Sequence, residues 1–563
     1  MDSILFKRIC VTYFSKTVLF LALTLIFTAE KSLAKRAMLI LRNQTYMSQV
    51  HDEIQQLRSH RNTHLTLNKT LGAPLRLEQI EKVLPKLNAL IIDYRNDSEL
   101  EGLRENSKIY TVEKEVKHPL PFPISQFYRK ALPQTLNSQF AFSLTPWGIS
   151  AIKAQEAWNL TQGGSSARVL VLDTGVDKDH PSIRGNLEQG KDFVGDNQDG
   201  YPYKDSVGHG THVSGTIAGV LDSTGFSGVA PRAHLLMGRV CSEDGCSNFA
   251  IAEGVNWGIE QKVDVINMSL GGSWSTITEQ IAIESAIKAG ITIVAATGND
   301  GVGSVSYPAA LPNCIAVGAL DVNNKRAEFS QYGPELAIMA PGVEVDSSVP
   351  LGKGRSPVVQ VKIGESSIES VKSTVLQGSR MISRPETYEM VYAGLGSEEE
   401  FKNVDVAGKI ALVERGELKF SEKVKNAIQA QAKGVIIYNN ADGLLNGSLS
   451  DDGSEVPVGV FMIEKVVGEK IKQSLIQGVQ ATAAYQVQVT NYGSNNGTSM
   501  ATPHVSGVVA LMKSVNKNLT PQQVKEILQR TASVIPNTNT NEYGAGLVNA
   551  EQAVIEAKNY LNP

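Results

Sequence analysis

The chain has 563 residues, of which 42% are hydrophobic and 20% are charged, a composition typical of two to four globular domains. Its formal net charge of −4 gives no indication of nucleic-acid binding or of a polybasic membrane-binding surface. Its four cysteines are too few for a scaffold built on disulfides.

The N-terminus has the pattern of a secretory signal peptide. Basic residues precede an apolar run at 17–29, and small residues follow at 32–34. The apolar run is shorter than the roughly 18 residues that a membrane-spanning helix needs, which favours a cleaved signal over an uncleaved anchor. We therefore expect a signal peptide at 1–34, with cleavage after Ala29 as an alternative, and a secreted, extracellular protein without a stable membrane anchor.

Residues 35 to about 117 have the pattern of a small α+β unit. Strands are expected at 37–41, 87–94 and 108–112, and helices at 51–61 and 97–105. Four prolines between Pro119 and Pro133 then interrupt regular structure, which indicates an exposed linker that proteases can reach. A compact unit before such a linker suits a pro-segment, although an ordinary N-terminal domain is the alternative.

From Trp147 onwards, apolar strand-like runs alternate with helical runs. Buried parallel strands are expected at 169–173, 235–240, 263–270, 291–296 and 315–319, with helices at 211–218, 249–261 and 277–289. This alternation predicts right-handed crossovers and a doubly wound parallel sheet. Because ligand sites in such sheets lie at the carboxyl ends of the strands, the polar residues there are the candidates for a site.

Residues 351–488 interrupt this alternation and predict an inserted domain. A stretch rich in Lys, Glu and Ser comes first. A second α/β set then follows, with strands expected at 409–413, 435–438 and 458–463 and helices at 421–432 and 465–475. After the insertion, two further helices are expected at 520–531 and 550–559.

Three residues at element ends have side chains suited to catalysis. Asp173 follows an apolar strand, and the single Asp-Thr-Gly here argues against an aspartic protease, which needs two such loops. Ser499 lies where a polar run meets a helical run, so it is either a nucleophile whose own N–H holds an oxyanion or an ordinary N-cap serine. Asn299 ends a buried strand and is either a second oxyanion donor or a turn residue.

His209 and His212 lie three residues apart at the start of an expected helix. This spacing can indicate metal ligation, but no acidic or cysteine partner lies nearby at ligand spacing. We therefore expect His212 to be a packed, hydrogen-bonded core residue.

The motifs around these residues follow one another in the order Asp173, His209, Asn299 and Ser499. They are Val-Leu-Asp-Thr-Gly at 171–175, Gly-His-Gly-Thr-His at 208–212, Ser-Leu-Gly-Gly at 269–272, Ala-Ala-Thr-Gly-Asn at 295–299 and Gly-Thr-Ser-Met-Ala-Thr-Pro-His at 497–504. Together they resemble those of the subtilisin-like serine proteases, the subtilases. The resemblance covers about 145–350 and 490–563 and implies a subtilisin-like α/β fold with a doubly wound parallel sheet.

The resemblance implies a serine endopeptidase that cleaves peptide bonds through an acyl-enzyme. Ser499 would be the nucleophile, His209 the general base and Asp173 the residue that orients the histidine. The oxyanion hole would consist of the Ser499 N–H and the Asn299 side chain. An α/β-hydrolase esterase is disfavoured because Ala501 stands where its nucleophile motif needs glycine. The other rival is a catalytically inactive binding protein that uses the inserted domain.

The resemblance also implies where a peptide substrate binds. The expected substrate-binding residues are Ser269, Leu270, Gly271, Gly272, Ala296 and Gly298. The specificity pocket would lie between 295–298 and 304–307, and its small, uncharged walls predict a preference for bulky apolar side chains. A basic preference steered by Asp300 is the alternative.

Two further segments resemble domains that accompany subtilases. Residues 87–115 resemble an inhibitor propeptide, which implies a self-processed zymogen cleaved between about Lys117 and Ser143, with the propeptide as intramolecular inhibitor. Residues 408–416 and 432–440 resemble a protease-associated (PA) domain. The expected domains are a signal peptide at 1–34, an α+β propeptide and linker at 35–135, a catalytic domain at 136–350 and 489–563, and an inserted α/β PA domain at 351–488.

No cofactor is expected to be required, and calcium is an open alternative. The family's calcium loop keeps Asp222, but Ser182 stands where a second acidic ligand is expected. The expected partners are protein or peptide substrates, without nucleic acid, and the protein is expected to be a monomer. In a secreted protein Cys241 and Cys246 could form a small-loop disulfide, whereas Cys314 is expected to be a buried free thiol.

Overall fold

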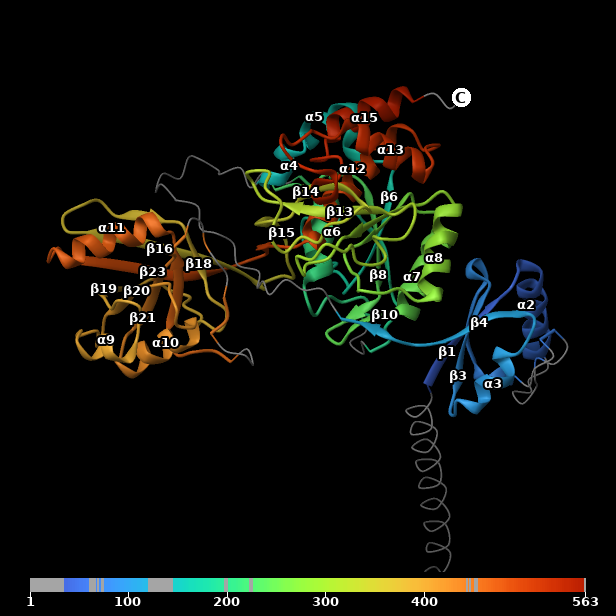
Figure 1. Cartoon of the computed structure of the whole chain (residues 1–563), viewed down its shortest axis with the longest axis horizontal. Coiled ribbons are helices and arrows are strands. Elements are labelled where there is room, and N and C mark those ends of the chain that lie inside the picture. The colour runs from blue at the N-terminus through green and yellow to red at the C-terminus, as the bar shows by residue number, and fades with distance from the viewer. Residues whose placement is uncertain are drawn as a thin grey trace, which may run out of the picture. The chain divides into compact units, whose positions relative to one another are not determined.

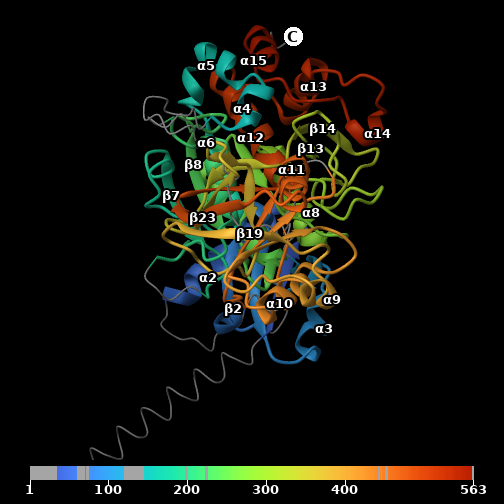
Figure 2. The ribbon, with the colours of Figure 1, turned by 90° about the vertical axis from the view of Figure 1, so that its left-hand side faces the viewer.

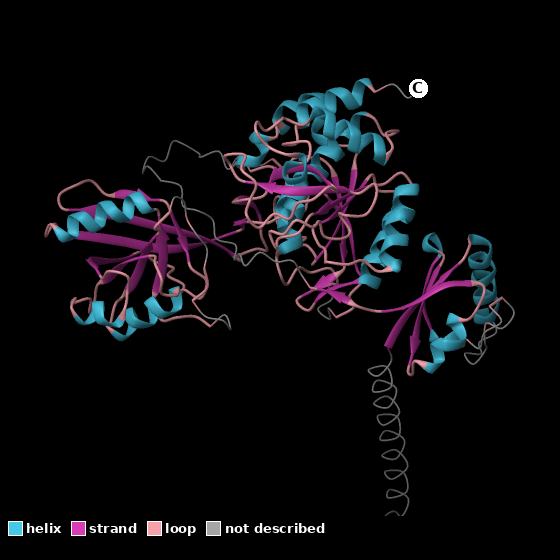
Figure 3. Ribbon diagram, viewed as in Figure 1, coloured by secondary structure: helices cyan, strands magenta, loops and turns pink. Residues whose placement is uncertain are grey.

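A computed structural model gives the fold of the chain (Figures 1 and 3). It describes residues 35–59, 67, 70–71, 75–119, 145–196, 201–221, 226–441, 444, 447–449 and 454–560. The expected signal peptide, most of the expected linker, and Asp222 lie outside these residues. In the part of the chain that is described, no helix is long and apolar enough to cross a membrane.

The described residues form two compact units, and the first contains the N-terminal α+β domain. This unit joins the chain up to Lys117 with 247–260 and 276–285. Its antiparallel sheet has the order β2-β3-β1-β4, formed by Lys35–Leu41 (β1), Ile80–Leu84 (β2), Ala89–Tyr94 (β3) and Ile109–Lys114 (β4). Helices α2 (Gln44–Ser59) and α3 (Ser98–Arg104) and two short 3-10 turns, Leu77–Gln79 and Pro85–Leu87, complete the domain. Alternate apolar residues of β1, such as Leu39 and Leu41, form a buried core with α2 and α3.

The second unit contains the predicted parallel sheet, which has seven strands in the order β14-β13-β12-β11-β6-β8-β7. The strands are Arg168–Asp173 (β6), Leu187–Asp192 (β7), His234–Arg239 (β8), Val265–Met268 (β11), Thr292–Ala296 (β12), Ile315–Leu320 (β13) and Leu336–Pro341 (β14). All neighbours pair in parallel. The chain runs from β6 to β8 on one side and later to β11 on the other, so the strand order reverses beside β6, where a parallel sheet offers a ligand site.

One helix of the second unit lies in the core. Helix α12 (Thr498–Val515) is buried from Thr498 to Lys513 and packs against β11, β12, β13 and helix α6 (His209–Ala218). In both Figures 1 and 2 it lies with the surrounding helices on one side of the sheet. Those helices are α4 (Trp147–Ala151), α5 (Ala154–Thr161), α13 (Pro521–Thr531) and α15 (Ala550–Asn559). The second unit also contains a 3-10 turn at Gln162–Gly164 and α14 (Thr540–Tyr543), whereas α7 (Asn248–Gln261) and α8 (Ile277–Lys288) lie largely in the first unit.

The insertion forms its own α/β domain with an eight-stranded sheet of order β17-β16-β23-β19-β20-β21-β22-β18. Its strands are Gly354–Ile363 (β16), Glu369–Val371 (β17), Ser373–Val375 (β18), Glu386–Tyr392 (β19), Ile410–Glu414 (β20), Gly434–Tyr438 (β21), Gly459–Ile463 (β22) and Ala481–Thr490 (β23). Its helices are α9 (Glu398–Lys402), α10 (Phe420–Gln429) and α11 (Lys465–Ile476). Strands β19 to β22 run parallel, and β20, β21 and β22 lie where strands were expected from the sequence.

The two ends of the insertion are held together by strand pairing. Strands β16 and β23 pair antiparallel from Gly354 with Thr490 to Ile363 with Ala481. Immediately outside the insertion, β15 (Val345–Ser348) pairs antiparallel with β24 (Tyr492–Asn495). The chain therefore returns to the point from which it left, which brings Ser499 back to the sheet that carries the rest of the predicted site.

Two buried histidines are uncharged members of the core. The His212 Nε2 atom lies 2.9 Å from the Val345 carbonyl, and His504 Nδ1 lies 2.9 Å from the Met500 carbonyl, so each ring donates to an oxygen. Burial lowers the pKa of His212 to about 3 and the pKa of His504 to about 4. The prediction that His212 is a packed core residue is therefore confirmed.

These histidines predict loss of stability in weak acid. Between about pH 6.5 and pH 4 each one binds a proton in the unfolded chain but not in the folded protein, so stability present above the unfolded pKa is lost as pH falls. Each contributes a slope of about 1.4 kcal/mol per pH unit to the free energy of unfolding. Denaturant titrations at pH 7 and pH 5 on wild type and His504→Asn should show a smaller pH dependence in the variant. An identical pH dependence in both proteins would contradict this.

Candidate active site

Asp173 is positioned by a buried strand and a glycine turn. It is the last residue of β6 and is 2% exposed, and its carbonyl accepts a hydrogen bond from Val240 N at 2.9 Å. Its Oδ1 accepts the N–H of Thr174 at 2.7 Å. Gly175 has a φ of +117°, and a Cβ there would lie 2.6 Å from the Tyr203 carbonyl oxygen. The sharp turn after Asp173 therefore needs glycine at position 175.

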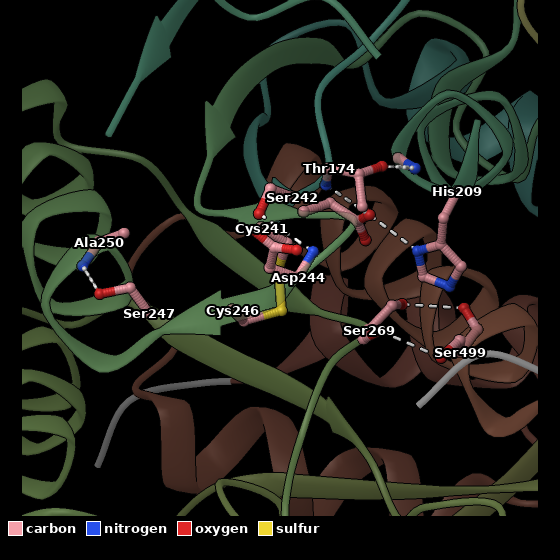
Figure 4. Close-up of a disulfide and its surroundings, with 12 residues drawn as sticks. Thr174, His209, Cys241, Ser242, Asp244, Cys246, Ser247, Ala250, Ser269 and Ser499 are labelled. Atoms are coloured by element: carbon pink, nitrogen blue, oxygen red, sulfur yellow. Dashed lines mark hydrogen bonds and ion pairs between the residues drawn. A yellow bond between two sulfur atoms is a disulfide. The ribbon is translucent and has the colours of Figure 1, made fainter. Parts of the chain in front are cut away.

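His209 is the first residue of α6 and is hydrogen-bonded to Asp173. Its Nδ1 lies 2.7 Å from Asp173 Oδ1, so the carboxylate fixes the tautomer with the proton on Nδ1. In Figure 4 the other ring nitrogen, Nε2, is turned toward the Ser499 side chain. Burial alone lowers the pKa of His209, but the charges of Asp173 and Asp205 and the hydrogen bond to Asp173 raise it above its usual value. The ring is thus poised to accept a proton at Nε2.

A second buried carboxylate, Asp205, supports this pair. Its Oδ1 accepts hydrogen bonds from Thr174 Oγ1 at 2.8 Å and Gly208 N at 2.6 Å. Its Oδ2 accepts from Thr211 N at 2.8 Å and from Thr211 Oγ1 at 2.6 Å. Burial raises the pKa of Asp205, and these four donors oppose that effect by favouring the charged form.

The Asp205 network joins the turn after Asp173 to the helix that carries His209. Thr174 Oγ1 donates to Asp205 and also accepts the Gly210 N–H at 2.9 Å. Asp205 was missed in the sequence analysis. Its signal was an acidic residue just before a helix start, where backbone N–H groups need acceptors.

Ser499 is the second residue of α12 and is fully buried. Gly497 occupies the N-cap position, so the interpretation of Ser499 as an ordinary cap is wrong. Its hydroxyl instead donates to the Ser269 carbonyl at 3.0 Å, and the Ser269 hydroxyl donates to the Ser499 carbonyl at 2.9 Å (Figure 4). This reciprocal pair joins the residue that follows β11 to the first turn of α12.

Asn299 is held toward the start of α12 and is not a simple turn residue. Its Oδ1 accepts hydrogen bonds from Thr498 N and Thr498 Oγ1, both at 2.9 Å. Gly298 N donates to the same Thr498 hydroxyl at 3.2 Å. Because the amide oxygen is committed to Thr498, the amide nitrogen of Asn299 is directed to the opposite side of its side chain.

The segments expected to bind substrate are neighbours. Gly272 and Tyr307 exchange two backbone hydrogen bonds, at 2.9 and 2.8 Å, and Ser306 N donates to the Thr297 carbonyl at 2.9 Å. Leu270 and Ala296 are buried, whereas Gly271 and Gly272 are partly exposed at the edge. The two predicted segments are therefore neighbours, and of the predicted residues only Gly271 and Gly272 are partly exposed.

Gln331 lies against the expected specificity pocket and was not predicted. Gly298 has a φ of +107°, and a Cβ there would lie 1.9 Å from Gln331 Oε1. Gln331 Nε2 donates to the Ser304 carbonyl at 2.6 Å, and its Oε1 accepts from Ser306 Oγ at 3.3 Å. This buried amide adds a polar but uncharged contact to the small walls, and no local sequence pattern distinguishes it.

Of the three cysteines that the structure describes, two form a disulfide and one is free. Cys241 and Cys246 form a disulfide, with an S–S distance of 2.08 Å, as the sequence suggested. Cys314 is a buried free thiol, and burial raises its pKa to about 12, so it is not a nucleophile.

Among the described residues no group of three or more His, Cys, Asp or Glu side chains is arranged to hold a metal ion. Ser182 takes part in hydrogen bonds with His180 and Ser348.

Comparison with known families identifies two segments of the chain. A model described as the subtilase family matches 164–379 and 468–546, and a model of the PA domain matches 386–471. The chain belongs to the subtilase family. The resemblance, the fold class and the PA domain expected from the sequence are thereby confirmed.

Individual subtilases are similar over different shares of the chain. A thermostable alkaline protease of Halalkalibacterium halodurans is 44% identical over 38% of this chain and 58% of its own length. Subtilisin Savinase of Lederbergia lenta is 46% identical over 36% of this chain and 74% of its own length. The M-protease of Shouchella clausii is 32% identical over 72% of this chain and 69% of its own length. The first of these relatives is thus matched over little more than half its length.

A solved subtilase has the same architecture. The subtilisin-like protease Apa1 from the Antarctic psychrotroph Pseudoalteromonas sp. AS-11 superposes with a TM-score of 0.55 at 30% identity. The match covers 74% of this chain and 99% of that one.

The Asp205 network predicts a change in pH dependence. Asp205→Asn removes one negative charge near His209 and should lower the pKa of that histidine, so the acid limb of kcat/KM for a peptide should move to lower pH. The amide would also turn a donor toward other donors and cost about 1–3 kcal/mol of stability. Thr174→Val is the control, because it breaks the same network but keeps the charge. An unchanged acid limb in Asp205→Asn would refute the electrostatic role.

Proposed function

We propose that this protein is a secreted serine endopeptidase that hydrolyses peptide bonds with Asp173, His209 and Ser499 as a catalytic triad. The observation that carries the proposal is the buried hydrogen bond of 2.7 Å between Asp173 and His209, with the opposite ring nitrogen turned toward Ser499. A buried imidazole whose pKa is raised by carboxylates is a suitable general base for a serine hydroxyl.

In the proposed reaction Ser499 Oγ attacks the carbonyl carbon of the scissile peptide bond while its proton passes to His209 Nε2. Asp173 stabilises the resulting imidazolium through the Nδ1 hydrogen bond. The imidazolium then returns the proton to the leaving amine as the carbon–nitrogen bond breaks, which leaves an acyl group on Ser499. A water molecule, deprotonated by His209, hydrolyses this ester and restores the hydroxyl.

The negative charge that develops on the carbonyl oxygen needs preorganised donors. Ser499 N lies in the first turn of α12, where backbone N–H groups lack intrahelical acceptors and carry the positive end of the helix dipole. The amide nitrogen of Asn299 is the proposed second donor, because Thr498 fixes the amide oxygen on the other side. Both donors would act without reorganisation during the reaction.

The substrate is proposed to lie as an extended strand along 269–272. Gly271 needs to be glycine, since a Cβ would lie 2.6 Å from the Tyr307 carbonyl oxygen. The buried Ala296, Gly298 and Gln331 carry no charge, which supports a preference for bulky apolar side chains next to the scissile bond. Asp300 remains the residue through which a basic preference would arise.

We also propose that the N-terminal domain is a propeptide that inhibits its own enzyme. Within its compact unit, Glu113 accepts hydrogen bonds from the N–H groups of Ile277 at 3.0 Å and Thr278 at 2.7 Å, at the start of α8. A carboxylate at a helix N-terminus is favoured by the unpaired N–H groups and by the helix dipole.

Further polar contacts in this unit are supplied by α7. Arg36 lies 2.9 Å and Lys82 lies 2.6 Å from the carboxylate of Glu253, which is 3% exposed. Val116 and Asn248 exchange two hydrogen bonds at 2.9 and 3.0 Å. Burial raises the pKa of Glu253, whereas the two basic residues lower it, so the carboxylate depends on its propeptide partners.

No cofactor is proposed for the reaction, because acid–base and nucleophilic side chains supply every step. If calcium binds near Asp222, we propose that it acts on stability alone. The protein is further proposed to act as an extracellular monomer on protein or peptide substrates, without nucleic acid or a stable membrane anchor.

Covalent labelling tests the nucleophile. A fluorophosphonate probe should label the mature wild-type protein and Ser514→Ala, in which a serine at the far end of α12 is removed, but not Ser499→Ala. Peptide hydrolysis should be lost in the same variant. Absence of label on wild type, or equal label on Ser499→Ala, would indicate a catalytically inactive binding protein.

N-terminal sequencing tests the zymogen. Active wild-type protein should begin between Lys117 and Ser143, whereas Ser499→Ala should retain the N-terminal domain because processing needs the nucleophile. Active enzyme that still begins near Lys35 would refute self-processing.

Chelation tests the proposal that no cofactor takes part. Catalytic rates measured with and without EDTA should agree. A rate that falls while the melting temperature stays constant would refute the cofactor proposal.

A further inference from the structure

The segment that follows strand β6 lies directly against the first turn of α6. A Cβ on Gly210 would collide with the carbonyl oxygen of Gly175, so the two backbones are in close contact. Asp177 N donates to the Thr211 hydroxyl at 3.0 Å, and that hydroxyl donates in turn to Asp205 at 2.6 Å. This segment therefore supports the first turn of the helix that carries the proposed base.

The side chain of Asp177 is bonded to the beginning of the inserted domain. Its Oδ1 accepts the N–H of Asp179 at 3.0 Å, and its Oδ2 accepts the N–H of Leu351 at 2.8 Å. The N–H of this aspartate thus contacts α6, whereas its carboxylate contacts the insertion. One residue joins the two.

The end of the insertion is joined to the same segment by Asn491. The Asn491 carbonyl oxygen accepts the N–H of Val349 at 2.9 Å and lies 2.8 Å from Nε2 of the fully buried His180. The Asn491 amide oxygen accepts the N–H of Gly352 at 3.1 Å. Both ends of the insertion are therefore bonded to residues 177–180, and all of these residues belong to the second compact unit.

Close packing is interrupted beside this junction by a cavity of about 730 Å³. Asp177 and residues 204–207, which lead to His209, line it together with Leu351 and Lys353 from the start of the insertion. Most of the lining side chains are polar or charged, so the dense apolar contacts that fix a protein core are missing here. The junction therefore depends on its hydrogen bonds.

We propose that Asp177 is a positioning residue for the reaction, which fixes the first turn of α6, and with it the ring of His209, to the base of the inserted domain. The inference rests on the proposed endopeptidase function. Proton transfer needs the base within hydrogen-bond distance of the serine hydroxyl, so a small displacement of the ring slows the chemical step. The segments proposed to bind substrate are not part of this junction, and their contacts stay intact.

The role of Asp177 differs from that of Asp205. The charges that raise the pKa of His209 are those of Asp173 and Asp205. Asp177 is not among them, so its contribution is geometric and needs only an acceptor oxygen. Loss of the hydrogen bond and loss of the charge can therefore be separated by substitution.

Substitution of Asp177 provides the first test. Asp177→Ala removes the acceptor of the Leu351 N–H and should lower kcat for a short peptide about fivefold at unchanged KM, as expected for one lost hydrogen bond. Asp177→Asn keeps an acceptor and should keep the wild-type kcat. In both variants the acid limb of kcat/KM should stay at its wild-type pH. Asp179→Ala is the matched control, because its carboxylate pairs with Lys178, and it should keep the wild-type kcat.

The same hydrogen bond can be removed from the side of the insertion. Leu351 is 43% exposed and is the second residue of a turn, in which Lys353 N donates to the Pro350 carbonyl at 2.9 Å and Gly352 has a φ of +74°. A type II turn with glycine at its third position accepts proline at its second, so Leu351→Pro removes the N–H and keeps the turn. Leu351→Pro should lower kcat as Asp177→Ala does. The double variant should be no slower than either single variant, because both remove the same bond.

Rates are divided by the concentration of sites that a fluorophosphonate labels, so protein that fails to fold does not count. Wild-type kcat in Asp177→Ala or Leu351→Pro, an equal loss in Asp177→Asn and Asp177→Ala, or additive losses in the double variant would overturn the inference. A shifted acid limb in Asp177→Asn would overturn it as well. Absence of label on wild type would overturn the proposed function instead, so the two failures are distinguishable.

Discussion

The position of one helix terminus determines the rest of the site. Helix α12 must begin between the ends of β11 and β12, and two sets of hydrogen bonds hold it there. Thr498 gives both of its donors to Asn299, and Ser499 exchanges hydrogen bonds with Ser269. The second set extends into the core, because Asn267 donates to the Ser269 hydroxyl and accepts from Ser506. Apart from Asn299, which is partly exposed, these residues are buried, so a shift of the helix would leave several buried polar groups unpaired at once.

This constraint also explains how the chain accommodates an insertion directly before its proposed nucleophile. A long flexible insertion would leave the position of the first residues of α12 undetermined. Instead β16 pairs with β23 along the full length of both strands, and β15 pairs with β24 outside them. These two pairs of strands join the beginning and the end of the insertion. A change in the conformation of the insertion therefore need not move Gly497, whose N–H donates to the Gly342 carbonyl at 2.8 Å. The PA domain is thereby compatible with a rigid site.

Three buried histidines show that position, and not burial, decides which one can act as a base. Burial disfavours the charged form of His209, His212 and His504 alike. Only His209 lies beside carboxylates, which reverse the effect, whereas the others donate to backbone carbonyls and stay neutral. The sequence predicted His212 correctly as a packed core residue, because no further ligand lies near it at metal-binding spacing. The role of His209 as a base stays a prediction, which its hydrogen bond with Asp173 supports. The sequence did not predict Asp205, whose role depends on donors from Thr174 and Thr211 that meet only after folding.

Strands with continuous apolar sequences were predicted, whereas strands with polar or alternating sequences were missed. Continuous Val and Ile runs revealed the central strands, because a strand buried on both faces has few polar residues. The edge strand β7 was missed because its sequence, Leu-Glu-Gln-Gly-Lys-Asp, is polar and half-exposed. Strands β16 and β23 were missed because alternate residues face solvent and their pairing spans the whole insertion. Gln331 was not predictable, since its contact with Gly298 joins distant loops.

The hairpin at 241–247 connects these observations with the proposed zymogen. Its inner side begins where Val240 binds the Asp173 carbonyl, and its outer edge holds the strand at 117–118. A peptide segment that belongs to the same chain has a high effective concentration at this edge, which favours the pairing of β5 (Lys117–His118) with β10 (Gly245–Ser247) as long as the chain is uncut.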